Sequence, residues 1–379
     1  MIQNNRITGA TKAKLLICLY SIPLHGIVNP IFREMNTDKN RTELSELGEF
    51  GLIEHLTKNH KTHDRSVVKG VGDDTAVIDG GDHYLLATKD LLVEGIHFDM
   101  AYTPLKHLGY KSVVVNLSDI AAMNGTPKQI LIGIAASNRY SVEALSELYE
   151  GIYAACKRYK VDMVGGDTTS SPAGLFISIT ALGKVKKDDV VYRSHAKIND
   201  LVCVSGDLGG AYMGLLLLER EKEVFKKDPG MQPDLRGHDY ILQRQLKPEP
   251  RFDVLENLRK AGIKPTAMID ISDGLASEIM HICKGSKAGC NLYEDKIPID
   301  PATAMIAEEF NIQPITAAMN GGEDYELLFT IPITDHEKIA ALKGISVIGH
   351  ITDESEGVNL IARDGTAVQV QAQGWEHMR

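Results

Sequence analysis

The stretch Gly70-Val71-Gly72-Asp73-Asp74 places two adjacent carboxylates after a glycine turn and directly before the apolar run Thr75 to Ile78. Glycine and aspartate are the ordinary residues of tight connections, so a solvated turn would account for the pair on its own. Adjacent acids also repel one another and break up a strand, which leads us to expect a positive group beside them. The stretch alone leaves both interpretations open.

Acids recur in the same kind of place along the chain, at the ends of apolar segments or inside them. They stand at Asp90, Asp119, Asp167, Asp270 and Asp273. An ionised carboxylate inside a buried helix, as expected for Asp119, is costly unless it is paired or bound to a metal. Each acid has a plainer explanation: Asp119 could face solvent at a helix edge, and Ser272 or Asp273 could cap a helix. The recurrence favours one constellation built from both halves of the chain.

The composition is typical of a globular protein. With 379 residues, of which 43% are hydrophobic and 24% charged, the chain can form a large core and two domains. The net charge of −10 argues against a general nucleic-acid binder, which needs a basic surface, and it fits an acidic, metal-dependent pocket. The five cysteines are scattered without metal-ligand spacing, which predicts reduced thiols and a cytoplasmic location.

Residues 1–41 differ from the rest of the chain. Lys12 and Lys14 precede the apolar run Leu15 to Leu24, which is too short to span a bilayer and is not followed by a small-residue cleavage pattern. We expect a leader that is disordered or not native, with Met35 as an alternative initiator. Export is the less favoured alternative.

Hydrophobic periodicity predicts the elements of the first half. We expect helices over 42–57, 105–123 and 142–159, and strands over 75–78, 83–88, 129–136, 161–164 and 175–185. Asn124-Gly125-Thr126-Pro127 ends the second helix with glycine and then proline. The charged break at Lys186-Lys187-Asp188-Asp189 predicts a domain boundary, so an N-terminal α/β domain covers 42–187.

The second half, 188–379, is expected to form an α+β domain. Strands are expected over 201–205, 268–271 and 325–331, and helices from the glycine turn to 218, over 251–261 and over 275–284. Residues 219–237 are charged and contain proline, which predicts an exposed excursion. Gly206-Asp207-Leu208-Gly209-Gly210 opens a helix and could hold an anion on its backbone N–H groups, or be a plain turn.

Scattered aspartates suit magnesium-assisted phosphoryl transfer. Such transfer needs positioning and charge neutralisation more than covalent help, and Mg²⁺ prefers oxygen ligands and shares its coordination with substrate phosphates. The sequence has no GxxxxGK[ST] loop, no Rossmann glycine fingerprint and no protein-kinase motif set. It also lacks a G-x-S-x-G elbow, which disfavours serine hydrolase chemistry.

Six motifs resemble, in order and spacing, those of the thiamine-monophosphate kinase family from about Glu46 to the C-terminus. They are Gly72-Asp73-Asp74, Thr88-Lys89-Asp90 with His97-Phe98, Asn116-Leu117-Ser118-Asp119-Ile120-Ala121-Ala122-Met123, Gly165-Gly166-Asp167-Thr168-Thr169, Asp270-Ile271-Ser272-Asp273-Gly274-Leu275, and Gly321-Gly322-Glu323-Asp324-Tyr325-Glu326-Leu327. Each motif is weak alone, but six in register make the resemblance specific. Residues 1–41 are outside it.

The resemblance implies the two-domain fold of the aminoimidazole-ribonucleotide synthetase-like superfamily, an α/β domain followed by an α+β domain, with homodimers that pair their N-terminal sheets. It implies a kinase that transfers the γ-phosphoryl group of ATP directly to thiamine monophosphate, with several Mg²⁺ ions. No strong general base is needed, because the acceptor phosphate oxygen is already deprotonated at neutral pH. The implied partners are ATP, thiamine monophosphate and a second copy of the chain, with neither nucleic acid nor membrane.

Carried over position by position, the resemblance implies three sets of site residues. The metal ligands are Asp74, Thr88, Asp90, Asp119, Asp167, Asp270 and Asp273. The ATP contacts are Tyr149, Gly166, Asp167, Arg193 and Ser272, and the substrate contacts are His97, Glu323 and Trp375. Without the resemblance, His97 would be an ordinary loop residue, Trp375 a packing residue and Arg193 a surface residue.

Lys89 departs from the family pattern, because it stands where the family commonly has a small hydroxyl residue; only its backbone carbonyl could then serve a metal. Two other functions stay open. One is a sister enzyme, such as aminoimidazole-ribonucleotide synthetase or selenophosphate synthetase, although the latter would need a reactive cysteine near the glycine-rich loop and Cys18 is remote from it. The other is a non-catalytic sensor of Mg-nucleotide or thiamine phosphate.

Overall fold

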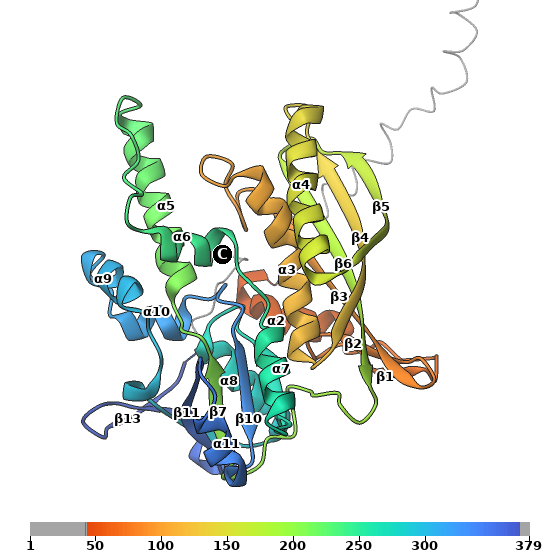
Figure 1. Ribbon diagram of the computed structural model, residues 1–379, viewed down its shortest axis with the longest axis vertical. Coiled ribbons are helices and arrows are strands. Elements are labelled where there is room, and N and C mark those ends of the chain that lie inside the picture. The colour runs from red at the N-terminus through yellow and green to blue at the C-terminus, as the bar shows by residue number, and fades with distance from the viewer. Residues whose placement is uncertain (1–41, 43, 372–379) are drawn as a thin grey trace, which may run out of the picture. The chain divides into compact units, whose positions relative to one another are not determined.

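The computed structural model describes residue 42 and residues 44–371 (Figure 1). Among the predicted site residues, Trp375 lies outside the described residues, and so does the expected leader. The described residues divide into two compact units, one up to His55 and one from Leu56 onward. The expected first helix is α2 (Leu44–Thr57), which is kinked at Gly48, where φ is 63°. The two sheets and the candidate site described below belong to the second unit.

The first sheet has six strands in the order β1-β2-β3-β6-β4-β5. They are β1 (Val67–Lys69), β2 (Ala76–Asp79), β3 (His83–Val93), β4 (Thr126–Ala136), β5 (Asp162–Ser170) and β6 (Leu175–Lys186). Neighbouring strands run antiparallel except β4 and β5, which are parallel. The expected hairpin of β2 and β3 is confirmed, and β3 extends to Val93.

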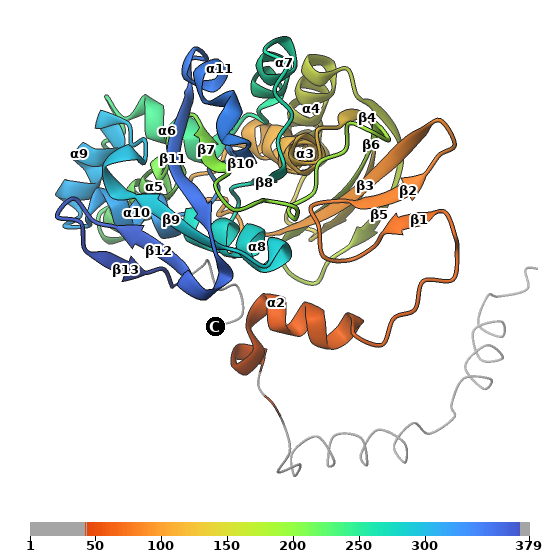
Figure 2. The ribbon, with the colours of Figure 1, turned by 90° about the horizontal axis from the view of Figure 1, so that it is seen from below.

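Helices α3 (Leu105–Ala122) and α4 (Val142–Tyr159) lie on one face of this sheet (Figure 2). They cross closely at two glycines, because a Cβ at Gly109 would overlap the carbonyl oxygen of Leu148 and a Cβ at Gly151 that of Lys106. Most of α3 is buried, as the sequence predicts. The helix ends at the predicted stop, where Asn124 has a left-handed φ of 55°.

Strand β5 is longer than the expected strand over 161–164 and forms an edge of the sheet. All its residues are exposed. It continues through Ser170 because Gly166 lets the two backbones approach closely. A Cβ at Gly166 would overlap the carbonyl oxygen of Ile132 on β4. The Gly-Gly-Asp-Thr-Thr motif therefore lies on a strand.

The second sheet has seven strands in the order β13-β12-β9-β11-β7-β10-β8. They are β7 (Leu201–Ser205), β8 (Ala267–Asp270), β9 (Gly289–Tyr293), β10 (Leu327–Ile331), β11 (Ile345–Thr352), β12 (Val358–Ile361) and β13 (Ala367–Gln369). The associated helices are α5 (Gly210–Lys227), α6 (Asp239–Leu246), α7 (Phe252–Lys260), α8 (Leu275–Ser286), α9 (Pro301–Glu309), α10 (Pro314–Asn320) and α11 (His336–Ala340). The chain passes from one sheet to the other between Lys186 and Leu201, close to the expected domain boundary.

Both faces of the second sheet are covered. Along β7, Val202 and Val204 pack with side chains of α8 and α10, whereas Leu201 and Cys203 pack with side chains of α7 and α11. Continuous burial of β7, β8 and β10 follows from this two-sided packing. The end of α3 joins the second of these clusters through Ala121 and Ala122. Helix α3 is therefore shared by the two sheets.

The expected excursion over 219–237 is wrong in its first part, because α5 continues to Lys227. The charges on this stretch pair within the helix at i,i+3 spacing, Lys222 with Glu219 and Lys226 with Glu223. Charge alone does not end a helix when the signs alternate in this way. Of the described helices, none is long and apolar enough to cross a membrane. The four described cysteines are free and buried.

Candidate active site

Four carboxylates gather where α3 passes between the two sheets. Asp74 comes from the loop before β2, Asp90 from β3, Asp119 from α3 and Asp270 from the end of β8. Burial raises the pKa of Asp74 to about 8, with the Arg193 charge opposing and the Asp270 and Asp73 charges adding to the rise. Burial and the Asp270 charge raise the pKa of Asp90 to about 7. These aspartates, separated by up to half the chain, form one electrostatic cluster.

Asp119 is at the centre of the cluster. Burial raises its pKa well above the usual value, and the charges of Asp90, Asp270 and Asp74 raise it further. The Thr88 hydroxyl donates a hydrogen bond to its Oδ2. This geometry contradicts the plainer interpretation of Asp119 as a solvent-facing acid at a helix edge.

The alternation of β3 explains why Thr88 and Asp90 point toward α3. Asp90 pairs with buried Ile179 of β6, while Lys89 is exposed on the opposite face of the strand. The backbone N–H of Asp90 donates to Asn116 Oδ1 of α3 at 3.0 Å. The Lys89 side chain is therefore directed away from the acids.

Asp270 is tied to α3 as well. Ser118 Oγ donates to Asp270 Oδ2 at 2.5 Å, which joins the residue before Asp119 to the second sheet. Burial raises the pKa of Asp270, and the Ser118 hydrogen bond and the Arg193 charge oppose that rise. The Ser-Asp dipeptide of α3 thus contacts both halves of the cluster.

The positive group expected beside Asp73-Asp74 is Arg193. Its Nη2 donates to Asp74 Oδ1 at 2.6 Å, and its backbone N–H donates to Asp73 Oδ1 at 3.1 Å. Asp73 also accepts from the Asp74 N–H at 3.3 Å, so it orders the turn. Lys69 adds a second, more distant cation, 3.9 Å from Asp73 Oδ2.

The loop before α8 does not use Ser272 or Asp273 as a helix cap. The N-cap is Gly274, without a side-chain hydrogen bond. Instead, buried Glu278 reaches back, and its Oε1 accepts from the N–H groups of Ser272 at 3.2 Å and Asp273 at 2.8 Å. The interpretation of these residues as ordinary caps is wrong, and both stay next to Asp270 at the end of β8.

The acids of the motif Gly321 to Leu327 have three different partners. Asp324 accepts from the Gly209 N–H at 2.7 Å and the Ala211 N–H at 3.3 Å, so it is the anion at the start of α5. Glu326 forms ion pairs with Arg244 and Arg251. Glu323 is the acid of this motif that contacts α3, through Lys111 Nζ at 2.9 Å.

Three other predicted residues contact residues outside the four acids of the cluster. Asp167 is paired across the sheet with Gly133, and through it with Ser178 and Leu91. Paired residues point to the same face, and Leu91 points to the face opposite to its neighbour Asp90. Asp167 therefore projects from the face opposite to Asp90. Tyr149 lies on α4 and packs edge-on against Tyr153, with ring centroids 5.9 Å apart. His97 lies in the turn after β3, where its Nδ1 accepts from the Val93 N–H at 3.1 Å.

Several residues of the site were not predicted from the sequence. Helix α3 carries three of them, Asn116, Ser118 and Lys111, together with Asp119. Helical spacing from Asp119 could have indicated Asn116 and Ser118. Tyr325 was also missed. Burial raises its pKa well above the usual value, and nearby charges of Glu323, Asp90, Asp270 and Asp119 add to the rise. Its phenol is therefore in electrostatic contact with both Glu323 and the acid cluster.

The donor atoms of the cluster fit Mg²⁺, which prefers carboxylate and hydroxyl oxygens. Among the described residues, Asp74 Oδ2 is buried without a hydrogen-bond partner, which is a poor arrangement unless a cation satisfies it. Within the same residues no three acidic, His or Cys side chains are arranged as a group that could hold a metal. The acids are thus neighbours, but they do not form a closed cage of their own.

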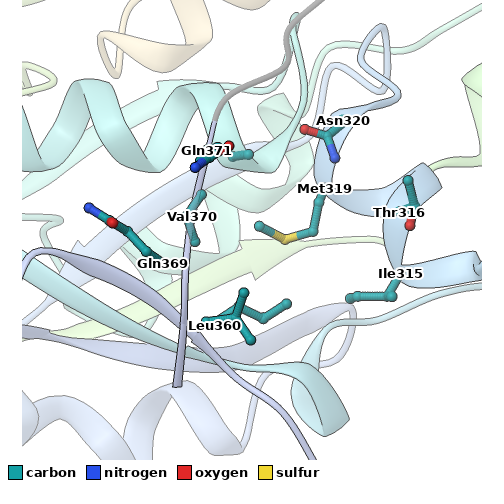
Figure 3. Close-up of a pocket in the computed structure, with 10 residues that line it drawn as sticks. Ile315, Thr316, Met319, Asn320, Leu360, Gln369, Val370 and Gln371 are labelled. Atoms are coloured by element: carbon teal, nitrogen blue, oxygen red, sulfur yellow. The ribbon is translucent and has the colours of Figure 1, made fainter. Parts of the chain in front are cut away.

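A small cavity of about 170 Å³ lies elsewhere in the second sheet, between α8, α10, β12 and β13 (Figure 3). Met319 and Ile315 of α10 point toward Leu360 and Val370 (Figure 3). None of the predicted site residues is among the described residues that line it. The cavity is separate from the acid cluster.

Similarity to known proteins extends over most of the chain. Residues 72–185 match the family described as "AIR synthase related protein, N-terminal domain". The chain is 38% identical over 323 residues to the thiamine-monophosphate kinase of Buchnera aphidicola subsp. Schizaphis graminum, covering 83% of this chain and 94% of that protein. It is 35% identical over 334 residues to that of Aquifex aeolicus, covering 88% and 99%. The solved structure "AaThiL complexed with AMPPCP and TMP" superposes with a TM-score of 0.77 at 33% identity, covering 89% of this chain and all of that one.

Proposed function

The chain belongs to the thiamine-monophosphate kinase family, and from this membership we propose that it transfers the γ-phosphoryl group of ATP to thiamine monophosphate, giving thiamine diphosphate and ADP. The structural observation that carries the proposal is the buried cluster of Asp74, Asp90, Asp119 and Asp270. Buried like charges are unfavourable unless the acids are protonated, which their raised pKa values favour, or unless cations bind among them.

The transfer forms one bond and breaks one. A phosphate oxygen of thiamine monophosphate attacks the γ-phosphorus, and the bond from that phosphorus to the β,γ-bridging oxygen breaks, so that ADP leaves with the electron pair. The attacking oxygen already carries negative charge at neutral pH, so no side chain has to remove a proton. The chain's own residues have to bind, orient and neutralise the two phosphate-bearing substrates.

The proposed Mg²⁺ ligands are Asp74, Thr88, Asp90, Asp119, Asp167, Asp270 and Asp273. Bound Mg²⁺ would neutralise charge on the phosphates during transfer. Five of these residues are in or next to the cluster described above, and Asp273 is close in sequence to Asp270. Asp167 has the least geometric support, because it lies on the opposite face of the sheet.

The proposed ATP contacts are Tyr149, Gly166, Asp167, Arg193 and Ser272. Arg193 is supported by its place beside Asp74, since a guanidinium there can bind a phosphate oxygen. The proposed contacts to thiamine monophosphate are His97, Glu323 and Trp375. Glu323 is supported by its link to the loop of the acid cluster, because its N–H donates to the Ser272 carbonyl at 2.6 Å.

We also propose that the N-terminal domain covers 42–187, the C-terminal domain covers 188–379, and two copies pair through the first sheet. The face of that sheet opposite α3 and α4 exposes Leu85, Leu91 and Leu131 on strands β3 and β4. A row of exposed leucines on a sheet is typical of an interface. Asp167 projects from this same face.

The test of the proposed function is a product analysis. Purified protein is mixed with ATP, Mg²⁺ and thiamine monophosphate, and thiamine diphosphate and ADP are quantified by chromatography. We expect the two products in equal amounts. Folded protein that makes no thiamine diphosphate would rule out the kinase, and binding of both substrates without turnover would indicate a sensor instead.

A further inference from the structure

Lys111 is a buried lysine in a helix that otherwise lines the acid cluster. Only 4% of the residue is exposed, and its Nζ donates to Glu323 Oε2 at 2.9 Å and to the Gln245 carbonyl at 3.0 Å. Burying an ammonium group is costly unless it is paired and hydrogen-bonded. Here both partners come from the second half of the chain, so the ammonium group joins α3 to the Glu323 turn and to α6.

The Glu323 carboxylate is held from two sides. Gln245 Nε2 donates to Glu323 Oε2 at 2.8 Å, so Lys111 and Gln245 share one oxygen. Among the described residues, neither bond uses Oε1, and the side chain is 29% exposed, which leaves that oxygen available to a ligand. A carboxylate fixed in this way can accept a hydrogen bond from an amino group of a ligand.

The backbone beneath Glu323 is constrained as well. Glu323 has a left-handed φ of 56°, and Gly322 a φ of 70°. A Cβ at Gly322 would lie 2.5 Å from the Ser272 carbonyl oxygen, the same atom that accepts from the Glu323 N–H. Non-glycine residues adopt such a φ where the surroundings enforce it, typically at functional sites.

We infer that Lys111 and Gln245 are positioning residues that fix Glu323 as the acceptor-recognition group of the kinase; the inference rests on the proposed function. Lys111 and Asp119 are eight residues apart on α3, which corresponds to about 12 Å along a helix. One rigid helix thus sets the distance between the group that recognises the organic part of the acceptor and the acids around the transferred phosphoryl group.

A positioning role and a structural role predict different kinetics. If the Lys111 ion pair served stability alone, its loss would lower the melting temperature and leave the KM for each substrate unchanged. If it orients Glu323, its loss raises the KM for thiamine monophosphate and leaves the KM for ATP unchanged.

The variants for the test are Lys111→Met and Gln245→Met, with Glu323→Gln as the reference. Gln245→Met removes the side-chain donor but keeps the backbone carbonyl that binds Lys111, so it serves if Lys111→Met fails to fold. The matched control is Lys106→Met, five residues earlier on α3, whose Nζ pairs with Glu150 at 3.1 Å on the surface.

We expect each positioning variant to raise the KM for thiamine monophosphate by about tenfold, the loss of roughly one charge-assisted hydrogen bond. The KM for ATP stays within about twofold, and Lys106→Met behaves as wild type. In the Glu323→Gln background, Lys111→Met should add little, because both changes act through the same carboxylate.

Three outcomes separate the possibilities, with calorimetric binding of thiamine monophosphate as a readout independent of turnover. Glu323→Gln could weaken the binding of thiamine monophosphate while both positioning variants bind it with wild-type affinity. The inference would then be wrong, and the proposed kinase function would still hold. If the Lys111 and Glu323 effects add fully, the inference is also wrong. A wild-type chain that neither binds nor phosphorylates thiamine monophosphate overturns the inference and the proposed function together.

Discussion

Both acids of the pair contact Arg193, but in different ways, which gives them different roles. Asp74 is paired with the Arg193 guanidinium and interacts with the charge of Asp270, whereas Asp73 accepts backbone N–H groups that order the turn. The sequence predicted a cation beside the pair but not which one, because Arg193 lies more than a hundred positions away and nothing local marks it. In the same way, local chemistry allowed Ser272 or Asp273 as a helix cap, but the N-cap is Gly274, and the buried Glu278 accepts from the N–H of Asp273 instead.

His281 of α8 gives a pH prediction at the residue scale. Burial, together with the charges of Arg193 and Lys284, lowers its pKa from 6.5 to about 4. The folded protein therefore binds fewer protons at this group than the unfolded chain between those two values. Its contribution to stability is complete above pH 6.5 and is lost as the pH falls toward 4.

The measurement is the melting temperature of wild type and His281→Gln from pH 4 to 8. Above pH 7 the two curves should run parallel, and below 6.5 the wild type should fall more steeply, by several degrees in total. Parallel curves throughout the range would show that the imidazole is not held neutral in the fold.

At the scale of elements, the close crossing of α3 and α4 keeps the acids in place. Its glycines gave no signal in the sequence, since helical periodicity predicts where a helix runs but not how near its neighbour lies. Periodicity did predict α4 to the residue, and it failed for α5, where paired charges continue a helix that composition alone would end.

Replacing Gly151 by Ala tests this crossing. Alanine is the better helix former, yet its Cβ would overlap the carbonyl oxygen of Lys106 on α3. We expect the free energy of unfolding to fall by about 1–3 kcal/mol, as in overpacked cores. Because α3 carries Asp119, turnover should fall too.

The control for this prediction is Gly51→Ala in α2, where the added Cβ would meet only Leu47 Cβ at an ordinary 3.5 Å. That change should be neutral or stabilising, by up to about 1 kcal/mol. Equal effects of the two substitutions in denaturant titrations would show that helix propensity, and not the crossing, decides the outcome.

For the whole molecule, the sequence predicted the order of elements well and the contacts between halves poorly. The links Ser118–Asp270, Arg193–Asp74 and Lys111–Glu323 each join distant segments, and no short-range pattern encodes them. The six motifs nevertheless contain the four acids of the cluster, Asp74, Asp90, Asp119 and Asp270. What they could not indicate is the sheet face of Asp167, because a strand's register is set by its neighbours.

The proposed dimer can be tested by changing the leucines on the exposed face of the first sheet. Leu91 and Leu131 are exposed, by 52% and 37%, on the face of the first sheet opposite α3 and α4. Replacing both by Lys places charges in a desolvated interface, so the dimer should dissociate. Sedimentation equilibrium should show dimers for wild type and monomers for the double variant.

Val142→Lys is the matched control, because Val142 is 77% exposed at the start of α4, on the side of the sheet that carries the helices. It should remain dimeric. A monomeric wild type, or a double variant that still dimerises, would place any interface elsewhere.

The central claim is that the acid cluster around α3 performs γ-phosphoryl transfer to thiamine monophosphate. The most direct test is the initial rate of thiamine diphosphate formation by wild type and Asp119→Asn, with folding checked by circular dichroism. The isosteric change keeps the shape and removes the charge, so the rate should fall by orders of magnitude while the protein stays folded. A folded Asp119→Asn variant with a rate near that of wild type would contradict the account.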